Sequence, residues 1–275
     1  MFVKKLIEDR LSVDIESITP LSGGDINDVY KINSSKGQFL IKCNSREMFP
    51  HMFEKEANGL KQLAKSGLTT PEVIAHFEQD ELQVLILQFL EEERVNKEFW
   101  TYFAQDLSKL HQNSQQFFGL EYDNYIGSLQ QTNQMKSSWE SFFIENRLKP
   151  LIKKAFDKNL LSQKHLNSFD GLFAFFSELI PVEQPSLLHG DLWSGNLLCA
   201  TGQKPVFIDP AVYYGHREVD LAMTQMFGGF DSAYLSFYND CFPLEKGWQN
   251  RISIHNLYPN LVHLILFGRS YLAGI

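Results

Sequence analysis

The side chains best suited to chemistry are concentrated in one stretch, residues 188–209. It reads LHGDLWSGN at 188–196 and ends in VFID at 206–209, so that Asp191, Asn196 and Asp209 lie in irregular chain beside short apolar runs. Phosphoryl transfer needs such a set. The carboxylate of Asp191 could accept or orient the proton of an attacking hydroxyl, and the oxygens of Asn196 and Asp209 could bind Mg²⁺ ions that bridge nucleotide phosphates.

The spacing within this stretch strengthens that hypothesis. In His-x-Asp-x-x-x-x-Asn the Asn follows the Asp by five residues, as it does in the catalytic loop of protein kinases. An isolated His-Gly-Asp is also common in turns, where Asp caps a helix and Gly permits a positive φ. The joint presence of Asn196 and of a strand that ends in Asp209 favours a functional site over a simple turn.

A lysine and a glutamate nearer the N-terminus could complete the site. Lys42 ends the predicted strand FLIK, so alternation points its side chain away from that of Ile41. It could contact the α- and β-phosphates of ATP while Glu56, on the following predicted helix, holds it in an ion pair. Glu54 is the competing partner, but Glu56 lies at the edge of the apolar stripe and Glu54 points more to solvent. A solvated lysine is the alternative interpretation.

The turn Ser22-Gly23-Gly24 is a weaker candidate for phosphate binding. Gly23 and Gly24 would let backbone amides approach phosphate oxygens closely. The run is neither Gly-x-Gly-x-x-Gly nor a Walker A sequence, and a Gly pair between two strands is above all typical of a hairpin turn. Both interpretations stay open.

The chain that must position these residues has two parts of different character. Residues 16–44 read as three strands of an antiparallel meander, 49–66 as an amphipathic helix, and 71–77 and 83–89 as two further strands. After the acidic trio at 91–93, helical spacing is found at 98–113, 137–158, 161–180, 217–227, 232–240 and 248–268. We therefore predict a strand-rich, nucleotide-binding lobe at 1–90 and a mainly helical catalytic and substrate lobe at 91–275.

The composition argues against several classes of protein. Among 275 residues, 25 Lys and Arg stand against 33 Asp and Glu, and a net charge of −8 argues against nucleic acid as a partner. Three cysteines far apart in the sequence predict a reducing, cytoplasmic setting. The start MFVKKLIEDR lacks the apolar run of a signal peptide, and no apolar run reaches the roughly 20 residues that span a membrane, so we expect no membrane contact.

Longer motifs connect the sequence to a known family. The runs LLHGDLWSGNLL at 187–198 and FIDPAVYYGHREVDLAMTQMFGGF at 207–230 resemble the fructosamine kinase (ketosamine-3-kinase) family, which is related to the aminoglycoside phosphotransferases. Further matches extend the resemblance over nearly the whole chain: SGGDINDVY at 22–30, MFEKEANGL at 52–60, FGLEYDNYIG at 118–127, WESFFIENRL at 139–148 and NLYPNLVHLILFG at 256–268. The resemblance implies an α+β, protein-kinase-like fold with two lobes.

The resemblance also implies an activity. It is the phosphorylation, by ATP and Mg²⁺, of the 3-hydroxyl of the sugar part of a ketosamine, a fructosamine or a ribulosamine, as a deglycation or repair reaction. By position, Asp191 is then the catalytic base, Asn196 and Asp209 are the magnesium ligands, and Lys42 and Glu56 orient the phosphates. The segment Gln88-Phe89-Leu90 is then the hinge that binds adenine. The substrate is either a small ketosamine or a glycated protein amine.

The side of the site that receives the substrate offers one strong candidate. A ketosamine carries hydroxyls and an amine that can be cationic, so its pocket should combine an aromatic surface with a polar acceptor. Trp193 lies between the proposed base and a proposed metal ligand, and its indole could stack on the substrate. The alternative is that Trp193 packs under the loop as part of the core.

Several histidines and acids are lesser candidates for substrate contact. His216 and Glu218 precede a predicted helix whose Asp220 is better suited to brace the catalytic loop through backbone hydrogen bonds. His263 lies on an apolar helical face, where a buried, hydrogen-bonded histidine is the default, although its position in the family allows it to line the sugar site. His189 is better interpreted as a scaffold of the loop than as an acid or base.

Two rival functions stay open at this stage. One is a kinase of another small molecule, of the aminoglycoside or amino-alcohol type. The other is a nucleotide-binding module without catalysis. The retention of Lys42, Glu56, Asp191, Asn196 and Asp209 argues against the second, because loss of a ligand is what inactivity predicts.

Overall fold

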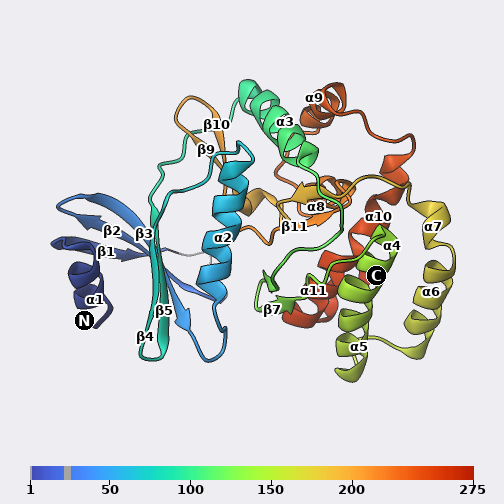
Figure 1. The fold of residues 1–275 in the computed structure, drawn as a ribbon, viewed down its shortest axis with the longest axis horizontal. Coiled ribbons are helices and arrows are strands. Elements are labelled where there is room, and N and C mark those ends of the chain that lie inside the picture. The colour runs from blue at the N-terminus through green and yellow to red at the C-terminus, as the bar shows by residue number, and fades with distance from the viewer. Residues whose placement is uncertain (1, 22–25) are drawn as a thin grey trace.

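The N-terminal part of the computed structural model, which describes residues 2–21 and 26–275, is a twisted antiparallel sheet with a helix on each side (Figure 1). The sheet has five strands in the order β1-β2-β3-β5-β4. Its elements are α1 (Phe2–Leu11), β1 (Ile15–Pro20), β2 (Asp28–Ser34), β3 (Gly37–Ser45), α2 (Met52–Lys65), β4 (Val73–Gln79) and β5 (Leu82–Gln88). The strands and α2 match the predicted ones to within a few residues, whereas no element was predicted before Ile15.

Alternation along the strands divides the apolar side chains between the two faces of this sheet. In β5, Val84 and Ile86 join the cluster that also contains Ile7 of α1. Leu85 and Leu87 point to the other face and pack with α2. The apolar residues of α2 recur every three or four positions, which gives the helix one buried stripe that lies on this face. Figure 1 shows α2 between the sheet and the rest of the protein.

The C-terminal part is mainly helical. Its helices are α3 (Lys97–Gln112), α4 (Trp139–Phe142), α5 (Lys149–Asp157), α6 (Gln163–Ala174), α7 (Phe176–Leu179), α8 (Glu218–Met223), α9 (Ala233–Cys241), α10 (Ile252–His255) and α11 (Leu257–Phe267). A π-helical turn at Phe143–Leu148 joins α4 to α5, and 3₁₀ turns lie at Ser194–Asn196, Trp248–Arg251 and Arg269–Gly274. The predicted helices at 161–180 and 248–268 are therefore divided into shorter ones, whereas the one at 137–158 continues through a π-helical turn.

Three pairs of short antiparallel strands complete this part. They are β6 (Asn124–Ile126) with β7 (Leu129–Gln131), β8 (Ser186–Leu188) with β11 (Tyr213–Gly215), and β9 (Leu197–Ala200) with β10 (Lys204–Phe207). The chain between β8 and β11 carries the predicted catalytic segment. Because its ends are held in strand pairs, the irregular backbone between them is fixed in place.

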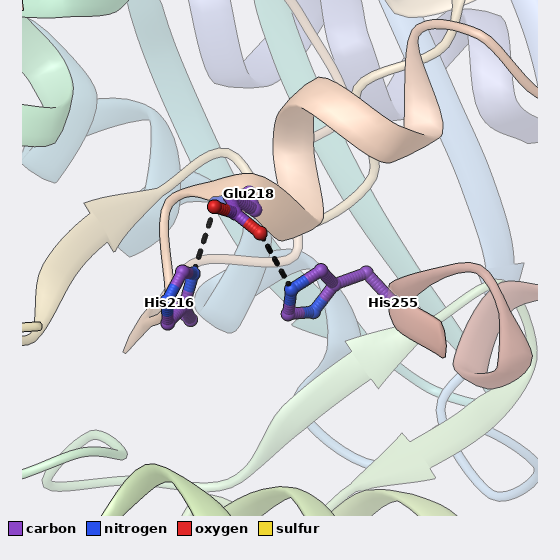
Figure 2. Close-up of side chains that lie close together, drawn as sticks. All are labelled: His216, Glu218 and His255. Carbon is purple, nitrogen blue, oxygen red and sulfur yellow. Dashed lines mark hydrogen bonds and ion pairs between the residues drawn. The ribbon is translucent and has the colours of Figure 1, made fainter. Parts of the chain in front are cut away.

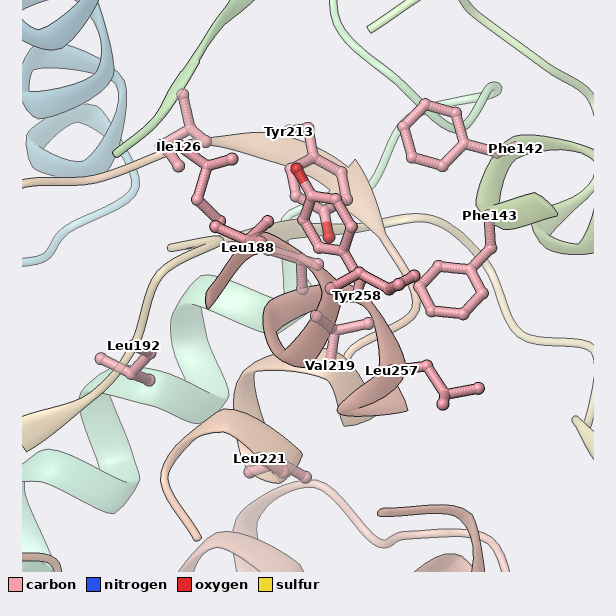
Figure 3. Close-up of a cluster of buried hydrophobic side chains, with 14 of the residues drawn as sticks. Ile126, Phe142, Phe143, Leu188, Leu192, Tyr213, Val219, Leu221, Leu257 and Tyr258 are labelled. Carbon is pink, nitrogen blue, oxygen red and sulfur yellow. The ribbon is translucent and has the colours of Figure 1, made fainter. Parts of the chain in front are cut away.

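The segment between β8 and β11 packs on one large hydrophobic core. It contains aromatic and aliphatic side chains from α3, α4, α11 and the short strands (Figure 3). Phe142 and Tyr213 stack with ring centroids 5.6 Å apart. Leu188 and Leu192, which flank residues 189–191, are fully buried. Burial of these large rings contributes the main stabilising term for this part of the protein. Among the described residues, no helix is both long and apolar enough to cross a membrane.

Candidate active site

The five polar side chains predicted to act together meet in one cleft. A cavity of about 230 Å³ opens between α2 and the C-terminal part, and Lys42, Glu56, Asp191, Asn196 and Asp209 all line it. They come from β3, α2, the segment after β8, and the turn after β10. Residues as far apart in the sequence as Lys42 and Asp209 are therefore in direct contact.

Lys42 is the buried centre of an ion-pair group. Its Nζ lies 2.8 Å from Glu56 Oε1 and 2.5 Å from Asp209 Oδ1, and its side chain is only 5% exposed. Burial disfavours the charged lysine, but the carboxylates of Asp209 and Glu56 outweigh burial and raise the pKa of Lys42. Glu54 is 54% exposed and faces His51 instead. The prediction of Glu56 over Glu54 as the partner of Lys42 is confirmed.

A close approach of α2 to the turn after β10 brings Glu56 to this group. Gly59 lies one turn after Glu56, and a Cβ at Gly59 would lie 3.2 Å from the ring of Pro210. Even a methyl group at this position would be in tighter than ordinary van der Waals contact, so α2 packs closely on the turn that carries Asp209. The short distance between helix and turn is what lets one lysine contact two carboxylates.

The backbone of the catalytic segment is held by a buried acid. The carboxylate of Asp220, in α8, accepts hydrogen bonds from His189 N at 2.7 Å and Gly190 N at 2.9 Å. Gly190 has φ +82, and a Cβ there would lie 2.1 Å from the carbonyl oxygen of Ala211, so only glycine fits. The predicted bracing role of Asp220 is confirmed.

His189 is a fully buried part of the same scaffold, as predicted. Its Nε2 lies 2.9 Å from the carbonyl oxygen of Ile208 and donates to it, and its Nδ1 accepts from Asp191 N at 3.3 Å. Burial lowers the pKa of His189, which favours the neutral ring that this pair of bonds requires. The imidazole therefore links the segment before Asp191 to the strand before Asp209.

Asp191 points into the cleft with one side-chain partner. Asn196 Nδ2 donates to the backbone oxygen of Asp191 at 2.8 Å and to its Oδ2 at 3.1 Å. Burial, and next the negative charge of Asp209, raise the pKa of Asp191 to about 7. A carboxylate with a pKa near neutrality can accept a proton from a substrate and release it again.

The donors around Asp209 fit a hard divalent cation. Asp209 binds Lys42 through Oδ1, which leaves Oδ2 as an acceptor, and Asn196 donates through Nδ2, which leaves its amide oxygen as an acceptor. Both residues line the same cavity, and carboxylate and amide oxygens are ligands that Mg²⁺ prefers. Asp209 also has φ +53, a conformation that non-glycine residues adopt at a cost and often at functional sites.

Two of the predicted substrate residues line the cavity. The ring of Trp193 lies across Gly195, where a Cβ would come within 2.3 Å of the indole, and the side chain is still 39% exposed. Trp193 thus packs on the loop with one part and faces the cleft with the other. His263 Nδ1 donates to the carbonyl oxygen of Pro259 at 2.7 Å, which leaves Nε2 as an acceptor on a neutral ring.

His216 and Glu218 do not line the cleft, which corrects the prediction that they contact substrate. They lie close to His255 instead (Figure 2). They are 0% and 2% exposed. Arg251 donates to both carboxylate oxygens of Glu218, at 2.5 and 2.8 Å, and His255 Nε2 lies 3.2 Å from one of them. The chain turns into the core after β11, so proximity in sequence to the catalytic segment does not bring these side chains to the cleft.

The same three residues could be mistaken for a metal site. Ligand atoms of His216, Glu218 and His255 lie within 4.8 Å of one another. The guanidinium of Arg251, however, already occupies both oxygens of Glu218 and would repel a cation. This cluster is therefore a structural ion pair that fastens α8 to α10.

Two predicted parts of the nucleotide site stay untested. Gly23 and Gly24 lie outside the described residues. Gln88 is the last residue of β5, and Phe89 and Leu90 begin the connection to α3; none of the three lines the cavity. The prediction that this hinge binds adenine stays a prediction.

The cavity also contains residues to which sequence reasoning gave no role. They include Lys55 of α2, Tyr125 and Gly127 at the β6–β7 hairpin, and Phe267 at the end of α11. The hairpin is held to the catalytic region by Asn124, whose Nδ2 donates to the carbonyl oxygen of Val212 at 2.8 Å. The run YDNYIG at 122–127 contains β6, but strands of three residues are too short for hydrophobic periodicity to predict them.

Comparison with known proteins adds independent findings. The sequence model of a family described as fructosamine kinase matches residues 2–275. A probable ketoamine kinase from Enterococcus faecium is 36% identical over 261 residues, which is 92% of this chain and 91% of that protein. A provisionally named fructosamine-3-kinase from Thermobifida fusca superposes with a TM-score of 0.89 at 30% identity, covering 98% of this chain and 94% of the other.

A more distant structure shows the fold alone. A thermostable mutant of an aminoglycoside phosphotransferase, solved as a ternary complex with AMP-PNP and hygromycin B, superposes with a TM-score of 0.67 at 15% identity, covering 100% of this chain and 92% of that one. Together with the sheet and helices described above, these likenesses confirm the predicted α+β, protein-kinase-like fold.

Proposed function

The chain belongs to the fructosamine kinase family, as its motifs predicted, and from that membership we propose that it phosphorylates the 3-hydroxyl of the sugar part of a ketosamine. It is an ATP-dependent phosphotransferase. In the proposed step the substrate hydroxyl oxygen forms a bond to the γ-phosphorus, and the bond from that phosphorus to the oxygen of ADP breaks. A fructosamine or ribulosamine would leave as its 3-phosphate, the first step of deglycation.

One observation carries this proposal. The Lys42–Glu56 ion pair, a carboxylate with a raised pKa and two hard oxygen donors share a single cavity with the indole of Trp193. Phosphoryl transfer depends mainly on positioning and on stabilising charge, and each of those needs has a residue here. Lys42, held by Glu56, would contact the nucleotide phosphates.

The proposed base is Asp191. Its carboxylate faces the cleft and would accept the proton of the substrate hydroxyl as the new bond forms. Asn196 fixes the orientation of this carboxylate, because its Nδ2 donates both to the side chain and to the backbone of Asp191. Asn196 and Asp209 would hold Mg²⁺, which when bound neutralises charge on the phosphates.

The ketosamine would lie between Asp191 and the ring of Trp193. Trp193 exposes part of its indole to the cavity, and His263 presents an acceptor nitrogen. The aromatic face would exclude water from one side of the sugar, and the nitrogen could accept a hydrogen bond from another hydroxyl.

An ATP-consumption assay tests the proposal. A fructosamine, a ribulosamine, an aminoglycoside and an amino alcohol are compared at equal concentrations, and we expect the two ketosamines to be consumed fastest. Faster turnover of the aminoglycoside or amino alcohol would identify a different small-molecule kinase. Nucleotide binding without turnover of any acceptor would indicate a non-catalytic module.

A further inference from the structure

Lys55 is a second lysine in the catalytic cavity. It lies on α2 directly before Glu56, and its side chain lines the cavity together with Lys42. Lys42 is neutralised by Glu56 and Asp209, its partners at 2.8 and 2.5 Å. Among the described residues, the ion pairs of α2 are formed by Glu54 and Glu56, and Lys55 takes part in none of them. The charge of Lys55 is therefore available to a ligand in the cavity.

The β6–β7 hairpin holds the Lys55 side chain in place. The Nζ atom of Lys55 lies 5.1 Å from the centre of the Tyr125 ring, a distance at which the face of a ring attracts a cation. The hydroxyl of Tyr125 also donates to the carbonyl oxygen of Pro50, in the turn before α2, at 3.1 Å. Figure 1 shows the hairpin beside α2. An aromatic face thus positions the ammonium and leaves its N–H donors to bind an anion.

The hairpin is itself fixed to the catalytic side of the cleft. Asn124 donates to the carbonyl oxygen of Val212 at 2.8 Å, and Gln131 donates to that of Ala211 at 3.1 Å. Both acceptors lie in the turn that begins at Asp209. The hairpin therefore connects α2, which carries Lys55, to the turn that carries a proposed magnesium ligand.

The charges in the cavity leave room for a further cation. Among the described lining residues, Lys42 and Lys55 stand against Glu56, Asp191 and Asp209. Because Lys42 is shared by two carboxylates, that group has a net negative charge. The complex of ATP with one Mg²⁺ is negative as well. Phosphoryl transfer spreads charge over the oxygens of the transferred group, and a cation placed beside them accelerates the reaction strongly. Of the two lysines, Lys55 is the one that can meet this need.

We propose that Lys55 binds the γ-phosphate of ATP and stabilises the negative charge of the phosphoryl group during its transfer. The inference rests on the proposed function, because the γ-phosphorus must lie next to the hydroxyl at Asp191. Lys55 donates hydrogen bonds to the phosphoryl oxygens and keeps its own protons, while Asp191 accepts the proton of the hydroxyl. Since ADP lacks the γ-phosphate, Lys55 also makes the site prefer ATP to the product nucleotide.

The expected size of the effect follows from the charge and the exposure of Lys55. A hydrogen bond to a charged group strengthens binding by about tenfold or more. Loss of one donor that faces developing charge slows an enzyme by about a hundredfold to a thousandfold. Lys55 is only half-buried, and solvent weakens its interactions, so we expect the lower value of each range.

The test measures the binding of ADP and of AMP-PNP by calorimetry with Mg²⁺ present and no acceptor. AMP-PNP keeps the γ-phosphate that ADP lacks. In Lys55→Met, which keeps an apolar chain beside Tyr125, the ratio of the association constants of AMP-PNP and ADP should fall about tenfold. The kcat with ATP and a fructosamine should fall about a hundredfold. Lys55→Arg keeps the charge and should hold the ratio within about threefold of the wild-type value.

Lys61→Met is the matched control. Lys61 is an exposed lysine on the same helix, and it does not line the cavity. Its nucleotide ratio and its kcat should equal those of the wild type. Thermal melting checks that each variant is folded.

Two results would overturn the inference and leave the proposed function intact. One is a wild-type nucleotide ratio in Lys55→Met. The other is an equal loss of affinity for ADP and AMP-PNP, because a residue that only fastens α2 to the hairpin would affect both nucleotides alike. Absence of phosphate transfer to a fructosamine by the wild type would instead remove the proposed function. The nucleotide ratio, which is measured without an acceptor, would then still decide whether Lys55 binds the γ-phosphate.

Discussion

Asp191→Asn should make the protein nearly inactive and also more stable. In the wild type, Asn196 Nδ2 donates to Asp191 Oδ2 at 3.1 Å, and the carbonyl oxygen of an asparagine at 191 could accept the same bond. The variant therefore keeps the geometry of the segment and loses only the charge. Without a proton acceptor, turnover should fall about a thousandfold.

The gain in stability follows from the raised pKa of Asp191. Folding moves this pKa from 3.8 to about 7, a difference of about 3 units that corresponds to at most about 4 kcal/mol. The Asp191 side chain is of intermediate exposure at the cleft, and solvent screening there reduces this to about 2 kcal/mol. In the metal- and nucleotide-free protein at pH 8, the melting temperature of Asp191→Asn should exceed that of the wild type by about 4 to 8 °C.

The sign of the pH dependence provides a sharper test. Between the unfolded pKa of 3.8 and the folded pKa of about 7, the native wild type binds more protons than the unfolded chain. Wild-type stability therefore falls as pH rises through this window, and the penalty is complete above the folded pKa. The advantage of Asp191→Asn should be largest at pH 8 and less than half as large at pH 5.

Calorimetric melting at pH 5 and pH 8 measures both effects. Asp170→Asn, an exposed acid on α6, is the control and should change the melting temperature little at either pH. An Asp191→Asn protein that is less stable than the wild type at pH 8, or whose advantage grows as the pH falls, would refute the reasoning. Undiminished turnover would remove Asp191 as the base.

Three further changes test the groups around the catalytic segment. Lys42→Met leaves the carboxylates of Glu56 and Asp209 facing each other without a cation. We expect the free energy of unfolding in urea to fall by about 3 kcal/mol and kcat/KM for ATP to fall about a hundredfold. An unchanged kcat/KM would contradict the role of Lys42. Asp220→Ala removes the acceptor of two backbone N–H groups and should lower the free energy of unfolding by about 3 kcal/mol; a loss below about 1 kcal/mol would show that the brace is dispensable. Gly190→Ala places a Cβ 2.1 Å from the carbonyl oxygen of Ala211, whereas a Cβ at Gly202, also at positive φ, meets no atom within 4 Å. Initial rates should therefore fall more than tenfold for Gly190→Ala and remain near wild type for Gly202→Ala, and equal rates in the two variants would show that the contact with Ala211 does not matter.

Local patterns in the sequence predicted the N-terminal sheet and its ion pair. Alternation in β3 places Lys42 on the face covered by α2, and the apolar stripe of α2 places Glu56 inward and Glu54 outward. Both are short-range rules, so one sequence suffices to apply them. The bracing role of Asp220 was predicted from its place in the helix that follows His216, and its acceptor bonds bear that out.

Contacts between distant parts of the chain could not be predicted in the same way. Glu218 is buried because Arg251 and His255, 33 and 37 residues later, neutralise it in the core. The β6–β7 hairpin depends on bonds such as that from Asn124 to Val212, 88 residues away. Periodicity within one segment does not predict which distant residues will contact it. The rings of Trp193, Phe227 and His263 likewise come from three segments that only tertiary packing brings together.

The position of the new phosphate tests the central proposal most directly. A fructosamine is incubated with the protein and ATP, and the product is examined by proton–phosphorus correlation NMR. We predict a single phosphomonoester whose phosphorus couples to the proton on carbon 3 of the sugar, formed by the wild type and absent with Asp191→Asn. A phosphate on another carbon, or release of free phosphate with the sugar unmodified, would contradict it.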